Sequence, residues 1–195
     1  MIKKIFSSIR YRINKKITYI KFKKKCNLRK LPNNIILQNP ENFVCGYNVH
    51  LGEECKILCT VSYRNRKYCP KITIGDNFHA TRNFTIQCAN SVNIGNNVLV
   101  ASNVFIIDYN HGINPMMASY LDTELDVSAG VQIDDGVWIG NSAIILPNVK
   151  IGKKAIIAAG AVVTKSIPEY TMAAGVPAII IKKYSFENER WESCI

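Results

Sequence analysis

The side chains best suited to acid–base chemistry are three histidines, of which His111 follows Asp108 at the end of the segment Ile-Ile-Asp-Tyr-Asn-His. A neutral imidazole can take a proton from an attacking hydroxyl near neutral pH and pass it to a leaving group. A carboxylate such as that of Asp108 can accept from the second ring nitrogen and fix the tautomer. The alternatives are a surface histidine at a corner of the chain and an aspartate that hydrogen-bonds its own turn.

The elements that must position these groups are indicated by aliphatic residues that recur strictly every six positions. A second apolar residue stands four places after each member, as at Val137 and Ala143. Neither the helical period of 3.6 nor the strand period of 2 gives this pattern. Hexapeptide repeats predict an all-β fold, a parallel β-helix with three repeats in each triangular coil. The period is carried by Ile133, Ile139, Ile145, Ile151, Ile157 and Val163.

The same period continues upstream in broken form, through Ile57, Ile74 and Ile106. One interruption lies at residues 62–70, where Tyr63-Arg-Asn-Arg-Lys-Tyr interleaves aromatic and basic residues. It predicts either a contact with a sugar or phosphate, or a solvated loop. A second interruption predicts an extruded loop at about 112–130. Loops on a rigid scaffold often carry function.

Bulk properties predict one domain, because 195 residues suffice for a single core. We find no apolar run long enough to span a membrane and no convincing secretory signal. The seven cysteines are odd in number and scattered, which predicts reduced thiols in a cytosolic protein.

Charge is concentrated at the N-terminus, since residues 1–40 hold twelve Lys or Arg and no acid. Apolar residues recur there at helical spacing, which predicts a basic amphipathic helix. It has three interpretations: contact of residues 1–25 with an anionic membrane surface, a cap on the open end of the β-helix, or nucleic-acid binding. No recognition motif supports nucleic acid, so we expect no such partner. The apolar positions are Ile2, Ile5, Phe6, Ile9, Ile13, Ile17 and Ile20.

Three motifs follow one another in the last third: Val-Trp-Ile-Gly at 137–140, Ala-Gly-Ala-Val-Val-Thr-Lys at 159–165, and Ala-Gly-Val-Pro-Ala at 174–178. Together they resemble the hexapeptide-repeat acyltransferases, in particular sugar O-acetyltransferases of the galactoside, maltose and surface-polysaccharide type, over about 45–183. The resemblance implies a left-handed β-helix, a homotrimer with its active site between subunits, and acetyl-CoA as donor without a metal. We expect a basic arm at 1–40, the β-helix at 41–183 and a tail at 184–195.

The resemblance also implies roles for single residues. His111 stands at the position of the family's catalytic base, with Asp108 close by. Many relatives read Asp-His-x-His here, and Tyr109 replaces the first of those histidines. The positions that match the family's contacts to coenzyme A are Trp138, Asn141, Ala159, Gly160, Thr164, Lys165 and Lys182.

The expected function is transfer of acetyl from acetyl-CoA to a sugar hydroxyl in capsule, lipopolysaccharide or exopolysaccharide synthesis. We expect it in the cytoplasm, with peripheral contact to the inner face of the membrane. One alternative is N-acetylation of an amino or nucleotide sugar. A remote alternative is a metal hydratase resembling the γ-type carbonic anhydrases, for which His50, His79 and His111 would have to converge on zinc.

Overall fold

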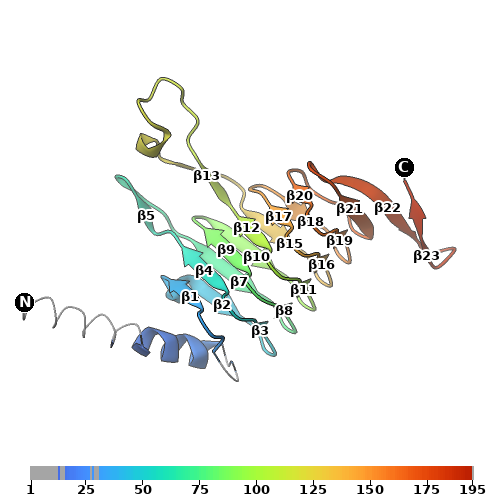
Figure 1. Cartoon of the computed structure of the whole chain (residues 1–195), viewed down its shortest axis with the longest axis horizontal. Coiled ribbons are helices and arrows are strands. Elements are labelled where there is room, and N and C mark those ends of the chain that lie inside the picture. Colours follow the sequence, from blue (N-terminus) through green and yellow to red (C-terminus); the bar gives the residue numbers. More distant parts are fainter. Residues whose placement is uncertain (1–12, 14–15, 27, 29–30, 195) are drawn as a thin grey trace, which may run out of the picture.

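Short parallel strands stack into a triangular solenoid in the computed structural model, which describes residues 13, 16–26, 28 and 31–194. Each coil contributes one strand to each of three sheets, and the coils rise from the N-terminal to the C-terminal end (Figure 1). Successive strands of a sheet therefore come from successive coils and pair in parallel.

Each of the three sheets is named by the number of strands that it has in the described residues. The six-stranded sheet contains β1 (Ile36–Gln38), β4 (Lys56–Cys59), β9 (Thr85–Cys88), β12 (Phe105–Ile107), β17 (Ile144–Ile145) and β20 (Val162–Val163). The five-stranded sheet contains β2 (Phe43–Cys45), β7 (Lys71–Ile74), β10 (Ser91–Ile94), β15 (Val131–Ile133) and β18 (Lys150–Ile151). The eight-stranded sheet contains β3 (His50–Leu51), β8 (His79–Ala80), β11 (Leu99–Val100), β16 (Trp138–Ile139), β19 (Ile156–Ile157), β21 (Thr171–Ala174), β22 (Ile179–Ser185) and β23 (Arg190–Ser193).

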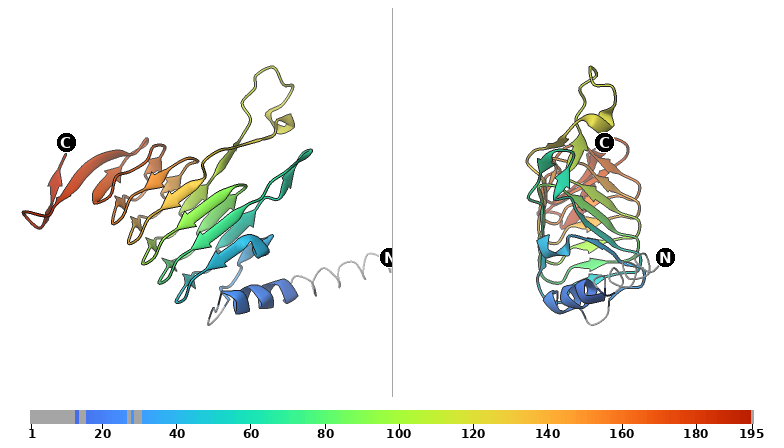
Figure 2. Two further views of the ribbon diagram at one scale, coloured as in Figure 1. Left: turned by 180° about the vertical axis from the view of Figure 1, so that it is seen from behind. Right: turned by 90° about the vertical axis from the view of Figure 1, so that its left-hand side faces the viewer.

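Two antiparallel hairpins project from the solenoid at the same edge (Figures 1 and 2). The first pairs β5 (Ser62–Tyr63) with β6 (Arg66–Lys67), and the second pairs β13 (Tyr109–His111) with β14 (Leu125–Val127). Short 3-10 turns lie at η1 (Pro40–Asn42) and η2 (Tyr120–Asp122).

The hexapeptide period fills the core as predicted. Ile133, Ile139 and Ile145 point inward from the five-, eight- and six-stranded sheets in turn, and all three are fully buried. The second apolar residue of each repeat, such as Val137, is equally buried at the corner that follows. Complete burial of such a side chain stabilises the fold by about 1.5–3 kcal/mol. The predicted parallel β-helix is confirmed.

Asparagines form a ladder along one corner. Asn48, Asn77 and Asn97 adopt φ angles of 54°, 55° and 56° in successive coils. Asparagine enters this left-handed region more readily than most residues. The Asn48 amide donates to Asn77 at 2.8 Å, and the Asn77 amide donates to Asn97 at 3.1 Å. The corner thus satisfies its own side-chain polar groups while turning the chain.

The outward faces of the sheets differ in polarity. On the five-stranded sheet the outward row starts with Val44 and is polar from Thr73 onward, for example at Asn93 and Gln132. On the eight-stranded sheet, Leu99 and Trp138 are neighbours and are 43% and 48% exposed. On the six-stranded sheet the corresponding row holds Phe105, Ile144 and Val162. Two of the three faces therefore present apolar rows, and the third presents a polar one.

A helix over residues 16–25 lies across the N-terminal end of the solenoid (Figure 2). Phe22 and Cys26 are buried in the core, and the Phe22 ring lies 5.2 Å from that of Phe43. The Tyr19 hydroxyl donates to the Ile35 carbonyl at 2.6 Å. This part of the arm caps the first coil, as one of the three interpretations predicted. The predicted apolar positions Ile2, Ile5, Phe6 and Ile9 lie outside the described residues.

No helix in the described residues combines the length and apolarity needed to cross a bilayer. At the other end of the chain, β22 pairs antiparallel with β21 and with β23. The residues expected to form a tail at 184–195 thus continue the eight-stranded sheet as far as Ser193.

All seven cysteines are free thiols. Cys55, Cys59 and Cys88 point into the solenoid and are fully buried. Burial raises the pKa of the Cys59 thiol to about 12, and it also raises the pKa of the Cys55 thiol. These cysteines therefore act as small core residues.

Candidate active site

His111 is an exposed residue at the end of β13, on the hairpin that leaves the solenoid directly after β12 (Figure 1). The excursion was expected at about 112–130, but its paired strands begin at Tyr109, so His111 belongs to the excursion itself. His111 lies opposite Leu125 in the β13–β14 ladder. The next amide, from Gly112, donates to the Glu124 carbonyl at 2.9 Å. The backbone of His111 is therefore held by antiparallel pairing on a projecting arm.

The other hairpin, β5–β6, lies against this arm. The Tyr63 ring is 5.2 Å from the His111 ring, with an interplanar angle of 73°. The Tyr63 hydroxyl donates to the Leu121 carbonyl at 2.9 Å. Sequence reasoning missed this contact, because it joins two separate insertions whose directions the hexapeptide period does not specify. The insert was expected to meet ligand or solvent, and instead much of it meets the β13–β14 arm.

Asp108 is fully buried just before β13. Its carboxylate accepts from the backbone amides of Ala89 and Asn90 at 2.8 and 2.9 Å, and from the Cys88 thiol at 3.1 Å. Burial, and then the charge of Asp108, raise the pKa of the Cys88 thiol. All three of these donors belong to the preceding coil, and none is the His111 ring. The geometry gives Asp108 a role in fixing the base of the arm on the coil below it.

The sequence did contain a signal for this burial. Cys59, Cys88 and Asp108 each stand two places after an inward isoleucine of the six-stranded sheet, and side chains two apart on a strand point to the same side. The register places Cys59 opposite Cys88. A carboxylate in that inward column must find donors.

Tyr109, which replaces the first histidine of the motif in many relatives, is half-buried. Its hydroxyl donates to the side-chain oxygen of Gln87 at 3.1 Å, on the outward side of the six-stranded sheet. Burial raises the pKa of the Tyr109 phenol, and a hydrogen bond with Thr60 opposes this shift. Tyr109 therefore connects the base of the arm to β9 of the preceding coil.

The residues expected to contact coenzyme A are exposed on the C-terminal coils. Asn141 and Gly160 stack at the corner between the eight- and six-stranded sheets, where the Gly160 amide donates to the Asn141 carbonyl at 2.8 Å. Ala159 precedes Gly160 at this corner. A Cβ added to Gly160 would meet no atom within 4 Å, so the corner is open to a ligand.

The remaining donor candidates form two further groups. Trp138 lies in a row on the eight-stranded sheet that continues through Met172 to Lys182. Thr164 and Lys165 follow β20 at the corner between the six- and five-stranded sheets. That is the edge from which the His111 arm projects, two coils earlier.

Within one chain, the width of the six-stranded sheet therefore separates His111 from three of the seven donor candidates. Asn141, Ala159 and Gly160 lie at one end of that sheet's strands, and the arm leaves at the other end. An active site that uses both sets needs a second chain or a ligand that crosses the sheet.

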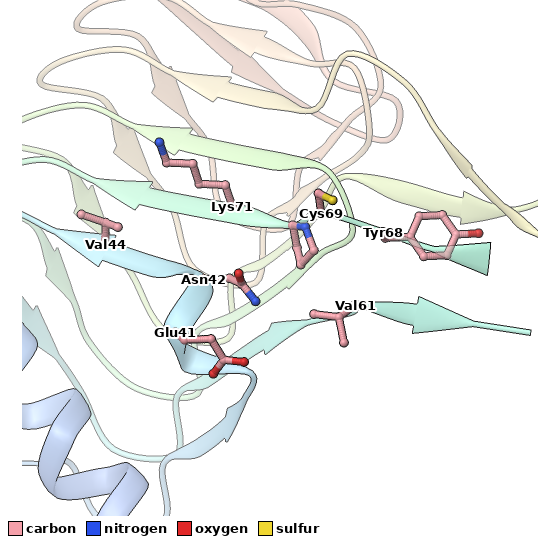
Figure 3. A pocket seen from close by; sticks show the side chains of 8 residues that line it. Glu41, Asn42, Val44, Val61, Tyr68, Cys69 and Lys71 are labelled. Atoms are coloured by element: carbon pink, nitrogen blue, oxygen red, sulfur yellow. The ribbon is translucent and has the colours of Figure 1, made fainter. Parts of the chain in front are cut away.

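A cavity of about 440 Å³ lies at the N-terminal coils, beside the base of the β5–β6 hairpin (Figure 3). Glu41, Asn42 and Lys71 supply its polar lining, with Tyr68 at its edge. None of the eight residues that line it is a predicted catalytic or donor residue. It is therefore separate from the candidate active site.

The three histidines lie on three strands that belong to two different sheets. His50 and His79 stack on the eight-stranded sheet with ring centroids 4.4 Å apart, whereas His111 lies on β13. Partial burial, and then the His50 ring, lower the pKa of His79. Within the described residues, no three His, Cys, Asp or Glu side chains are grouped to hold a metal ion. Within one chain, His111 therefore does not lie on the sheet that carries the stacked pair of His50 and His79.

Comparison with known proteins bears on the repeat segment and on the whole fold. Residues 130–165 match the family model described as bacterial transferase hexapeptide (six repeats). A solved structure of galactoside acetyltransferase in complex with coenzyme A has a TM-score of 0.58 and 29% identity, over 77% of this chain and 70% of that chain. The chain is thus similar to hexapeptide-repeat transferases, and both this resemblance and the left-handed β-helix predicted from the motifs are confirmed.

Two curated relatives of this chain are named as O-acetyltransferases. The chain is 40% identical to the putative lipopolysaccharide biosynthesis O-acetyl transferase WbbJ of Escherichia coli (strain K12), over 62% of this chain and 65% of that protein. It is 38% identical to the galactoside O-acetyltransferase of the same strain, over 66% of this chain and 65% of that protein. The chain thus spans somewhat less than two thirds of either relative.

Proposed function

We propose that the protein is an acetyl-CoA-dependent O-acetyltransferase that modifies a sugar hydroxyl in the synthesis of capsule, lipopolysaccharide or exopolysaccharide. The observation that carries this proposal is the exposed His111 on a braced arm of a hexapeptide solenoid whose relatives are sugar O-acetyltransferases. The hydroxyl oxygen attacks the thioester carbonyl while His111 takes its proton. The carbon–sulfur bond then breaks, and the proton passes from His111 to the departing thiolate.

The acids of the arm favour a hydroxyl acceptor over an amine. An amine acceptor would often be positioned by a carboxylate, and the arm carries Asp122, Glu124 and Asp126. Asp122 and Glu124 are ion-paired, with Arg64 at 2.7 Å and Arg66 at 2.9 Å, and are therefore poorly suited to hold an ammonium group. Asp126 lies opposite Asn110 in the β13–β14 ladder, so its side chain points to the other face of the hairpin from that of His111.

The test is release of free thiol from acetyl-CoA in the presence of a panel of sugars, amino sugars and lipid-linked sugars. We expect turnover with an acceptor that offers only hydroxyl groups, and an ester product that mild base removes. Turnover confined to amine acceptors, with an alkali-stable amide product, would replace this proposal with N-acetylation.

We propose further that the active site is completed by a neighbouring chain in a homotrimer. Two observations support this: the arm that carries His111 and the corner of Asn141, Ala159 and Gly160 lie at opposite ends of the strands of the six-stranded sheet, and two of the three sheet faces carry partly or fully exposed apolar rows. A closed ring would bring the corner of Asn141, Ala159 and Gly160 of one chain to the arm of the next. Lys165 and Lys182 could then meet the phosphates of coenzyme A, with Trp138 and Thr164 beside the pantetheine arm.

We also propose that the protein acts in the cytoplasm with its N-terminal helix on the membrane surface. Ile13, Ile17 and Ile20 are 52%, 45% and 58% exposed and lie on the helix face opposite Phe22. Exposed lysines surround this apolar stripe, among them Lys16, Lys21 and Lys24. A helix that is buried on one side and apolar and basic on the other suits an anionic lipid surface.

Vesicle co-sedimentation tests this contact. We expect the full chain to bind phosphatidylglycerol-containing vesicles, and to bind less as salt rises, because surface lysines are screened. The variant Ile13→Ser/Ile17→Ser/Ile20→Ser should lose binding, and the control Val44→Ser/Val61→Ser should keep it. Equal sedimentation of the triple variant and the natural chain would contradict the proposal.

A further inference from the structure

The β5–β6 hairpin is the largest departure from the hexapeptide period before the arm, and much of it contacts the arm. It is inserted between the inward residues Ile57 and Ile74. Its turn includes Arg64, at a φ of 51°. The side chain of Arg64 reaches η2, and the side chain of Arg66 in β6 reaches Glu124, directly before β14.

Tyr63 is fixed at both ends. Its backbone belongs to β5, where it pairs with Arg66, and its hydroxyl donates to the Leu121 carbonyl of the arm. Between these two anchors, the ring meets the His111 imidazole at 5.2 Å and 73°. Edge-to-face contacts of this kind prefer one relative orientation of the two rings. The Tyr63 ring therefore restricts the rotation of an imidazole that is otherwise exposed.

Charged contacts join the same two hairpins. Arg64 donates from Nε to the Leu121 carbonyl at 2.5 Å and pairs with Asp122, while Arg66 pairs with Glu124. Each pair is exposed and individually weak. Three contacts from one short turn to adjacent residues of one loop nevertheless oppose the same motion, which is separation of the hairpins.

A buried contact connects this brace to His111 through the backbone. The Tyr68 hydroxyl accepts from the Leu125 amide at 3.0 Å, and Leu125 lies opposite His111 in the β13–β14 ladder. Tyr68, Ala89 and Leu125 form a small buried cluster, with Tyr63 and Tyr109 packed against it. The cluster fixes the backbone of the arm, and Tyr63 fixes the ring.

We propose that Tyr63 is a positioning residue for His111, and that the β5–β6 hairpin is a brace that holds the catalytic arm in its working geometry. The proposal rests on the proposed function only in taking His111 as the base. Tyr63 need not contact the reacting atoms. Its ring limits the orientations that the imidazole can take. Misplacing a catalytic group by about 1 Å can cost on the order of 10²-fold in rate.

The experiment compares Tyr63→Ala, Tyr63→Leu and Tyr63→Phe, with steady-state kinetics and thermal melting for each. We expect Tyr63→Ala and Tyr63→Leu to lower kcat by about tenfold, with the KM for acetyl-CoA unchanged. Tyr63→Phe keeps the ring and should stay within about twofold of the natural chain. The control is Tyr47→Ala, an exposed tyrosine on the first coil, which should leave kcat unchanged.

A double variant separates positioning from a general loss of structure. Because Tyr63 acts through His111, Tyr63→Ala should slow the His111→Ala variant no further. A further tenfold loss in the double variant would overturn the proposal, as would full kcat in Tyr63→Ala or equal losses in Tyr63→Ala and Tyr63→Phe. If His111→Ala itself kept full activity, the proposed base would fail instead, so the two failures are distinguishable.

Discussion

Replacing His111 with alanine lowers kcat by about 10²–10⁴-fold, the usual loss when a general base is removed. The variant should fold normally, because His111 is exposed and its backbone pairing with Leu125 does not need the imidazole. The KM for acetyl-CoA should change little, since the donor candidates lie on later coils. The measurement is thiol release with the acceptor that the panel identifies.

The matched control is His50→Ala, which removes an exposed histidine from the first coil without touching the arm. It should keep the activity of the natural chain. Activity that survives in His111→Ala would mean that another group takes the proton, and the assignment of the base would then fall. Loss in both variants with lowered melting temperatures would point to folding and not to proton transfer.

Two inactive variants, His111→Ala and Ala159→Trp, should restore activity to one another when they are co-expressed. Ala159 lies exposed at the open corner beside Gly160, so a tryptophan there obstructs the approach of the pantetheine arm. In a three-chain ring where each site takes the base from one chain and the donor corner from the next, every mixed particle keeps about one intact site in three. Neither variant has such a site alone.

The two variants carry different affinity tags, and only particles that hold both tags are assayed. The control joins the natural chain with the double variant His111→Ala/Ala159→Trp, which should also give active mixed particles. If mixed particles of the two single variants stay inactive while this control is active, each site is built within one chain. The proposed site between neighbours would then be wrong.

The solenoid could be predicted from the sequence because its physics is local and repetitive. A residue such as Ile139 is inward because the residues six before and six after it are inward, and each coil repeats the same packing. The position of His111 at the end of this regularity was also readable. The burial of Asp108 follows from the strand period of 2, once it is read together with Cys59 and Cys88.

The brace could not be predicted, because it depends on the directions in which the β5–β6 and β13–β14 hairpins leave the solenoid. The pairing of His111 with Leu125 crosses a loop that has no hairpin turn signal, and the contact of Tyr63 with His111 joins segments on different coils. The sequence also allowed Arg64 and Arg66 of the insert to be interpreted as phosphate ligands, because it does not show which acids lie near them. Their partners, Asp122 and Glu124, are acids of an extruded loop whose position no period fixes.

The two ends of the solenoid bear on how the molecule avoids growing into filaments. An open edge of parallel strands is a template on which another chain can add. At the C-terminal end, β22 turns back antiparallel along β21 and takes up the edge of the eight-stranded sheet. At the N-terminal end, the helix that carries Phe22 covers core residues that the first coil would otherwise leave exposed. Elements unlike the repeat therefore occupy both ends of the solenoid, which disfavours end-to-end association while leaving the sheet faces free to associate side by side.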